Sequence, residues 1–271
     1  LMDAHIPYEP TADHDRWGGD RARSLQNHVK EQKWEFSGGK RPWWQKRALE
    51  GLYDGSIRQA DALVGQIVDT LEARGELDDT LLVVTADHGE GFGERSLVRP
   101  GVRVAEHNVS IHEALLHVPL LVKAPGQTEG ERVDGLVSLS DFPTAVERAR
   151  DGSTPDFRTD DPVISTAVGL DEAKQARARP HVDDLSLYTA TTRAVYDHDG
   201  DDVVKYVTWR DRARTIVVPD TFTSYVREDT DNGRVGDVFG AFDDATLVDS
   251  SGGVDDMDET TQRQLEDLGY I

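Results

Sequence analysis

The sequence contains no cysteine, which excludes disulfide bonds, thiolate metal sites and a cysteine nucleophile within its 271 residues. Long hydrophobic runs are also missing, since no apolar stretch approaches the roughly 20 residues that a membrane-spanning helix needs. No signal peptide is visible. The first residue is Leu1 rather than methionine, so we expect a fragment of a longer protein, and the missing signal then says little about its compartment.

Basic side chains are outnumbered, because 30 Lys and Arg stand against 52 Asp and Glu and give a formal net charge of −22. Aspartate is favoured over glutamate, and arginine over lysine. This bias resembles that of proteins from extreme halophiles, in which concentrated salt screens the self-repulsion of an acidic surface. An acidic disordered chain is the alternative, but apolar periodic segments through most of the sequence argue against it. We expect no nucleic-acid binding from a chain of this charge.

One segment departs from the acidic background and gathers basic side chains among three tryptophans, Trp34, Trp43 and Trp44. The basic residues are Arg21, Arg23, Lys30, Lys33, Lys40, Arg41, Lys46 and Arg47. In so acidic a chain, this basic island would suit a large anionic substrate. An ordinary solvated loop followed by a helix start is the alternative.

The first 180 residues alternate between helical and strand-like patterns. Apolar residues recur at three- and four-residue steps between Pro42 and Gly75, which predicts a long helix. Leu81–Ala86 and Val118–Lys123 are apolar runs of strand length, and Val163–Ala167 resembles a third, shorter strand. Runs of this kind are typical of strands buried on both faces of a parallel sheet. We therefore expect an α/β fold with a mostly parallel central sheet flanked by helices.

The pattern changes after about residue 180. Leu187–Val195, Val203–Trp209 and Thr215–Val218 are β-rich runs separated by short turns, which predicts an antiparallel sheet. A short helix is expected at Leu265–Leu268. We therefore divide the chain into a part of an α/β catalytic domain, residues 1–180, and a small α+β subdomain, residues 181–271.

Asp87 and His88 follow the strand-like run Leu81–Ala86 directly, and Gly89 allows a tight turn after them. Sites in open α/β sheets form beyond the carboxyl ends of strands, and a carboxylate beside an imidazole suits a divalent cation. The alternative is that Asp87 only caps a turn while His88 packs. Two further loops also carry histidines, His5 near the N-terminus and His107 before residue 110.

Taken in order, these segments resemble the C-terminal portion of a sulfatase of the alkaline phosphatase-like superfamily, with a haloarchaeal bias in composition. The segments that carry the resemblance are His5–Pro7, Tyr53–Gly65, Asp79–Glu90, Val118–Val122, Ser140–Thr144, Val204–Tyr206 and Leu268–Tyr270.

The resemblance implies an alkaline phosphatase-like sandwich that hydrolyses small-molecule or polysaccharide sulfate esters with a divalent metal, Ca²⁺ or Mg²⁺. It implies that Asp87 and His88 are metal ligands. It also implies that His5 is a catalytic residue able to protonate the leaving oxygen, and that His107 binds the sulfate group.

The resemblance also implies an early acidic metal-binding pair and a Cys- or Ser-x-Pro-x-Arg segment, whose first residue becomes the formylglycine nucleophile. Neither is present, since the chain has no cysteine and no serine followed by x-Pro-x-Arg. Both precede the His-x-Pro loop in the family, so we expect them upstream of Leu1. The alternatives are a phosphate or phosphonate ester hydrolase of the same superfamily, and a catalytically inert truncated fragment. The oligomeric state stays open.

Overall fold

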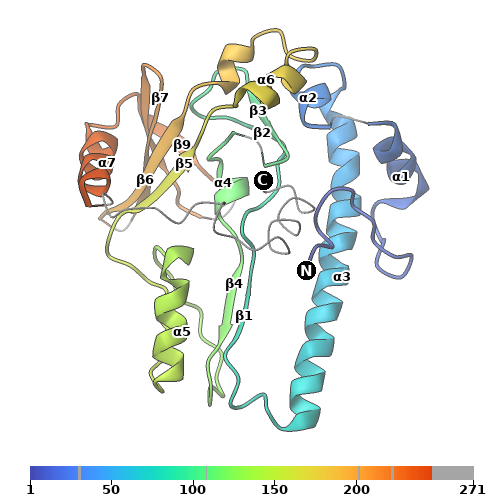
Figure 1. Ribbon diagram of the computed structural model, residues 1–271, viewed down its shortest axis with the longest axis vertical. Helices are drawn as coiled ribbons and strands as arrows, with labels where there is room; N and C mark the ends of the chain where they lie inside the picture. The colour runs from blue at the N-terminus through green and yellow to red at the C-terminus, as the bar shows by residue number, and fades with distance from the viewer. Residues whose placement is uncertain (30–31, 108, 201, 221–222, 246–271) are drawn as a thin grey trace. The chain divides into compact units, whose positions relative to one another are not determined.

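A computed structural model describes residues 1–29, 32–107, 109–200, 202–220 and 223–245 (Figure 1). The chain forms two compact units, Leu1–Val235 and Gly236–Ile271. The expected helix at Leu265–Leu268 lies outside the described residues, and the division into residues 1–180 and 181–271 stays a prediction. Among the described residues, no helix combines the length and the apolar character that crossing a membrane requires.

The predicted long helix is α3, Trp43–Arg74. It begins directly after Pro42, and Gly75 closes it in the left-handed conformation with a φ of 67°. One face of its N-terminal half packs against α1 (Gly19–His28) and β2 (Phe92–Arg95), in a core that also contains Tyr8 and Phe36 of α2 (Gln32–Ser37). This core fixes the N-terminal loop against the segment that follows Asp87.

The two central apolar runs form β1, Leu82–Thr85, and β4, Leu120–Lys123. They pair antiparallel, with Thr85 opposite Leu120 and Leu82 opposite Lys123. The expectation of parallel pairing and full burial is therefore wrong for these strands, which are only half-buried. An apolar run indicates contact on both faces but not strand direction, which the connection between the strands decides.

The connection from β1 to β4 contains a hairpin that the sequence patterns did not predict. β2 and β3 (Arg103–Ala105) form an irregular hairpin, and α4 (Glu113–Leu116) follows it. After β4, a short helical turn, η1 (Leu139–Asp141), leads into α5 (Phe142–Arg150).

A five-stranded antiparallel sheet forms the other half of the first unit, in the order β5-β6-β7-β8-β9. Its strands are β5 (Val163–Ala167), β6 (Thr192–Asp199), β7 (Asp202–Trp209), β8 (Arg212–Val217) and β9 (Tyr225–Glu228). The predicted antiparallel sheet is thus confirmed, and it includes β5, which we had expected in a parallel sheet. The remaining elements are α6 (Glu172–Ala178), η2 (Leu185–Tyr188) and α7 (Arg234–Ala245).

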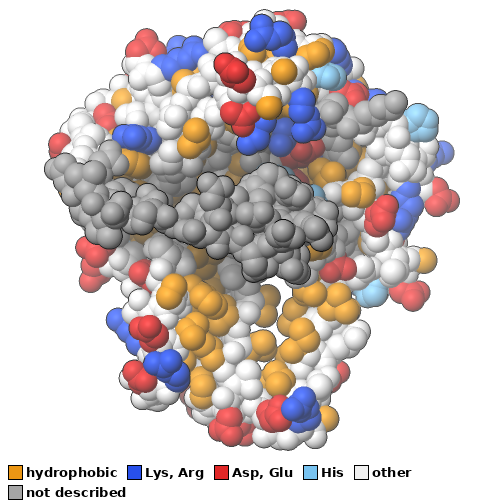
Figure 2. All heavy atoms as spheres, viewed as in Figure 1, with side chains coloured by type: hydrophobic (Ala, Val, Ile, Leu, Met, Phe, Trp, Pro, Cys, Tyr) orange, Lys and Arg blue, Asp and Glu red, His pale blue; other side chains and the backbone are white. Residues whose placement is uncertain are grey.

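All strand pairs among the described residues are antiparallel, so the architecture is mixed α/β and a mostly parallel central sheet is not seen. The segment between β2 and α4 packs on the five-stranded sheet, where Val98 and Ile111 join Val207 and Ile216 in one apolar cluster. Hydrophobic side chains also gather on the surface over α3, β4 and α5 (Figure 2). The exposed ones on these elements include Ile57, Ile67, Leu121, Phe142 and Val146.

Candidate functional site

Tyr8 joins the N-terminal loop to the turn that follows β1. Its side chain is completely buried, and its hydroxyl donates to a carboxylate oxygen of Glu90 over 2.8 Å. Gln26 fixes the Tyr8 backbone, because its side-chain amide accepts from Tyr8 N and donates to Tyr8 O, both over 3.0 Å. Burial, followed by the charge of Glu90, raises the pKa of Tyr8 well above its usual value, so the phenol stays a donor. His5 is thereby held on a loop anchored three residues from Asp87.

Asp87 and His88 lie side by side at the end of β1. The backbone N–H of His88 donates to Asp87 Oδ1 over 3.0 Å, and His88 Nε2 lies 3.9 Å from Asp87 Oδ2. His88 Nδ1 lies 2.8 Å from the carbonyl of Gly89, so this nitrogen carries the proton and Nε2 keeps its lone pair. The Asp87 side chain is 61% exposed, and the His88 side chain is 36% exposed. The Asp87 carboxylate and the His88 Nε2 nitrogen are ligand types that suit a divalent cation, and their spacing fits one ion.

Among the residues that the structure describes, no group of three or more His, Asp or Glu side chains is arranged to hold a metal ion. The Asp87–His88 pair therefore offers two ligands, and a cation bound there would take its other ligands from elsewhere.

His107 stacks on His88. The ring centroids are 4.3 Å apart, and the planes are tilted by 32°. Partial burial of its ring lowers the pKa of His107 to about 4, although the residue keeps exposed surface. The nearby His88 and Lys33 act in the same direction. His107 is therefore a neutral imidazole at neutral pH.

His5 is exposed, and its Nδ1 lies 2.7 Å from the carbonyl of Ile6, which leaves Nε2 open. Its charge also contributes to lowering the pKa of His107, so the two rings lie within electrostatic range. The four residues singled out from the sequence thus fall in one region. His88 directly contacts Asp87 and His107, and His5 acts on His107 through its charge.

Two lysines of the basic island reach the surroundings of this site. Lys33 Nζ lies 3.7 Å from Glu106 Oε2, beside His107. Lys46 is completely buried, with its ammonium 4.8 Å from the centre of the Phe92 ring. Burial lowers the pKa of Lys46, and the carboxylates of Glu90 and other residues oppose that shift.

Most of the other cations of the basic island are engaged within the fold. Arg23 pairs with Asp15, and Arg47 pairs with Glu50. Arg41 pairs with Glu35, while Lys40 donates to the carbonyl of Pro180. Lys30 lies outside the described residues. These contacts favour a folded, internally neutralised segment over an open landing surface for anions.

Sequence patterns missed Tyr8, Glu90 and Glu106 as parts of this region. Tyr8 and Glu90 are 82 residues apart, and no local pattern marks them as partners. For Tyr8 the only available signal was its position three residues after His5, and for Glu90 its position three residues after Asp87.

Comparison with known proteins relates this chain to sulfatases. Residues 9–149, more than half of the chain, match the sulfatase family. The chain is similar to arylsulfatase K of Gallus gallus, with 32% identity over 105 residues, covering 38% of this chain and 18% of the relative. It is 33% identical over 104 residues to arylsulfatase K of Xenopus laevis, with coverage of 38% and 18%. It is also 32% identical over 103 residues to choline-sulfatase of Rhizobium meliloti, with coverage of 38% and 19%. The matched region therefore spans under a fifth of each of these relatives.

Proposed function

Because this chain belongs to the sulfatase family, we propose that the complete protein is a metal-dependent hydrolase of sulfate esters. The observation that carries the proposal is the convergence of Asp87, His88 and His107 beside the anchored loop of His5.

In this proposal Asp87 and His88 hold a divalent cation, Ca²⁺ or Mg²⁺. When bound, the cation supplies Lewis-acid stabilisation of the negative charge that develops on the sulfate group. The hydrogen bond between His88 Nδ1 and Gly89 supports this role, because it orients Nε2 for coordination.

His5 would assist departure of the alcohol. Its Nδ1 is occupied by the carbonyl of Ile6, so the proton available for transfer is the one that Nε2 carries in the imidazolium form. A general acid of this kind protonates the leaving oxygen as the ester bond breaks.

His107 would bind the sulfate group as a neutral hydrogen-bond donor, because its lowered pKa leaves it uncharged at neutral pH. Lys33 lies close enough to influence His107 and would supply the positive charge that a neutral imidazole lacks. The substrate class is a small-molecule or polysaccharide sulfate ester.

The formylglycine nucleophile does not fit any residue of this chain, which has neither a cysteine nor a serine in the required context. We therefore place it on a part of the complete protein outside these 271 residues and assign it no step here. A phosphate or phosphonate ester hydrolase is the second candidate, since an Asp-His pair on a divalent cation stabilises either anion.

The first test is Asp87→Ala in the complete protein, assayed with 4-nitrophenyl sulfate and 4-nitrophenyl phosphate in molar salt. Losing a metal ligand should lower Ca²⁺ or Mg²⁺ affinity in calorimetry and reduce sulfate hydrolysis at least about 100-fold. Asp69→Ala, an exposed aspartate on α3, is the matched control and should change neither quantity. Unchanged metal affinity in Asp87→Ala would refute the metal assignment. If the unaltered protein hydrolysed 4-nitrophenyl phosphate faster than 4-nitrophenyl sulfate, the phosphate ester hydrolase would be favoured.

The second test assays residues 1–271 alone. Without a nucleophile, this chain should bind the ester but not turn it over. Sulfate release by this chain would contradict our assignment of the nucleophile to another part of the protein. Absence of activity in the complete protein as well would favour the alternative that the protein is catalytically inert.

A further inference from the structure

The segment that carries His107 has an unfavourable backbone conformation. Glu106 and Val109 both have positive φ values, 57° and 43°. Val109 is β-branched, and its Cβ substituents make the left-handed region a marked outlier. Such backbone persists only where the surrounding structure holds it in place. The contacts made by Val109 and its neighbours therefore bear on the position of His107.

Arg99 makes one of these contacts. Its side chain is 2% exposed, and its guanidinium donates to the carbonyl of Val109 and, over 3.3 Å, to the carbonyl of Leu187. No carboxylate pairs with it among the described residues. Its role is thus to tie the strained residue to the turn at η2 rather than to neutralise an acid.

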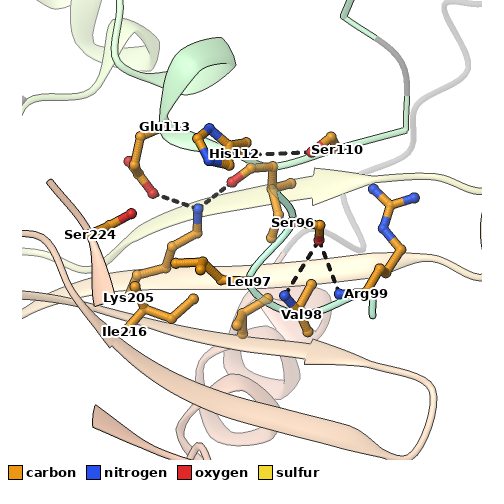
Figure 3. A pocket seen from close by; sticks show the side chains of 12 residues that line it. Ser96, Leu97, Val98, Arg99, Ser110, His112, Glu113, Lys205, Ile216 and Ser224 are labelled. Atoms are coloured by element: carbon orange, nitrogen blue, oxygen red, sulfur yellow. Dashed lines mark hydrogen bonds and ion pairs between the residues drawn. The ribbon is translucent and has the colours of Figure 1, made fainter. Parts of the chain in front are cut away.

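Lys205 makes the second contact, from the five-stranded sheet (Figure 3). Its buried ammonium donates to the carbonyl of Ile111 and, over 2.7 Å, to Glu113 Oε1. The Tyr196 hydroxyl lies 3.0 Å from both oxygens of Glu113. The ion pair is enclosed, with side chains 4% and 12% exposed, so it is screened little by solvent. It fixes the start of α4 on the sheet.

The same helix touches the turn of the predicted metal ligands. The N–H of Gly89, next to His88, donates to the carbonyl of Leu115 over 2.8 Å. The approach is close, since a Cβ on Gly89 would lie 2.1 Å from the carbonyl oxygen of Ala114. One segment, residues 109–115, is therefore held by two buried cations and contacts the loops of both His107 and His88.

We propose that Arg99 and Lys205 are positioning residues that hold His107 against His88 by clamping the carbonyls of Val109 and Ile111. Neither residue is placed to touch the sulfate ester. The inference rests on the proposed function only for the role of His107 in binding sulfate.

The experiment compares Lys205→Met and Arg99→Lys with the unaltered protein. Lys205→Met keeps an unbranched side chain of similar length but removes its donors. Arg99→Lys keeps the charge but replaces the planar guanidinium fork with a shorter side chain that ends in a single ammonium. Hydrogen-exchange mass spectrometry should show at least about ten-fold faster exchange in peptides 86–91 and 104–112, which corresponds to local opening. The cross-relaxation signal between the His88 and His107 rings should be lost in protein labelled with ¹³C-histidine.

Arg234→Met is the matched control, because it breaks an ion pair with Asp197 on β6 that shares no residue with the contacts of Arg99 or Lys205 described above. It should leave both readouts unchanged. If Lys205→Met fails to fold, Glu113→Gln, which removes the charge at constant shape, should give the same local acceleration. Folded variants that keep the ring signal and the protection of peptide 86–91 would overturn the proposal.

A functional readout separates this inference from the proposed function. In the complete protein, Arg99→Lys should raise KM for the sulfate ester more than it lowers kcat. If the complete protein has no sulfatase activity but the His88 and His107 rings separate in the variants, the positioning role is supported and the proposed function is refuted. If sulfatase activity is present and the two rings stay together in the variants, only the positioning role of Arg99 and Lys205 is refuted.

Discussion

The hydroxyl of Tyr8 contributes to stability through a single hydrogen bond to the Glu90 carboxylate. Tyr8→Phe removes this bond from a fully buried position and leaves one Glu90 oxygen without its donor. We expect a loss of about 2 kcal/mol in the free energy of unfolding, because the bond involves a charged group. Urea denaturation in molar salt would measure it.

Tyr53→Phe is the matched control for that prediction. Tyr53 packs in the same aromatic group, with its ring 5.3 Å from that of Tyr8 and 5.1 Å from that of Phe92. Its hydroxyl makes no hydrogen bond among the described residues, so removing it should change stability by less than about 0.5 kcal/mol. Equal losses of unfolding free energy in Tyr8→Phe and Tyr53→Phe would contradict a stabilising role of the Tyr8–Glu90 hydrogen bond.

His112 predicts a pH dependence of stability. It caps α4, with Nδ1 accepting from the N–H of Ala114 over 3.0 Å, and burial, followed by the charge of Lys205, lowers its pKa. A histidine whose pKa is lower in the folded state binds fewer protons there than in the unfolded state. The stability it contributes is therefore complete above about pH 6.5 and is lost as the pH falls below that value.

The variant His112→Asn keeps a side-chain oxygen at the cap but cannot titrate. Between pH 8 and pH 5 its thermal midpoint should fall less than that of the unaltered protein. Parallel curves for the two proteins would contradict the assignment of this titration to His112.

At the scale of single residues, the sequence singles out Asp87 and His88 because they are adjacent and follow an apolar run. Tyr8 and Glu90 could not be predicted as partners, since their contact joins segments 82 residues apart. Lys205 and Glu113 are also separated by 92 residues, and nothing local marks either as buried. Pairing across such distances depends on tertiary structure that no spacing rule encodes.

At the scale of elements, two glycines of α3 should respond to alanine with opposite signs. Gly75 ends the helix with a φ of 67°, a conformation that costs any side chain about 1 kcal/mol. Gly65 lies within the helix, and an added Cβ would meet nothing within 4 Å there. Gly75→Ala should therefore destabilise by about 1 kcal/mol, whereas Gly65→Ala should stabilise by a similar amount.

Urea midpoints of the two variants would check this prediction, and each serves as the control for the other. If Gly75→Ala stabilised the protein, residue 75 would have to leave the left-handed conformation in the variant, and the prediction would be wrong.

The elements themselves could be predicted where their patterns are regular. The periodicity between Pro42 and Gly75 locates α3, and the β-rich runs after residue 200 locate β7 and β8. The pairing of β1 with β4 could not be predicted, because composition carries no information on strand direction. The hairpin of β2 and β3 was missed because glycine and charged residues obscure any alternation there.

At the scale of the whole molecule, charge is the dominant feature. The net charge of −22 makes self-repulsion a cost of folding at low ionic strength. The ion pairs in the described structure neutralise many of the arginines locally, such as Arg158 with Asp156 and Arg227 with Asp199. The excess of aspartate is left for the solvent to screen.

Salt should therefore stabilise this protein. Raising KCl from about 0.1 M to about 1 M shortens the Debye length from about 10 Å to about 3 Å, which weakens the repulsion between exposed charges. We expect the thermal midpoint to rise steadily over this range, and part of the structure to be lost at the low end. Sucrose stabilises by exclusion without screening, so it serves as a control for effects unrelated to charge. The variant Asp160→Asn with Asp161→Asn removes two exposed negative charges and should depend less steeply on salt. A midpoint that does not change with KCl would contradict the interpretation of the acidic composition as an adaptation to concentrated salt.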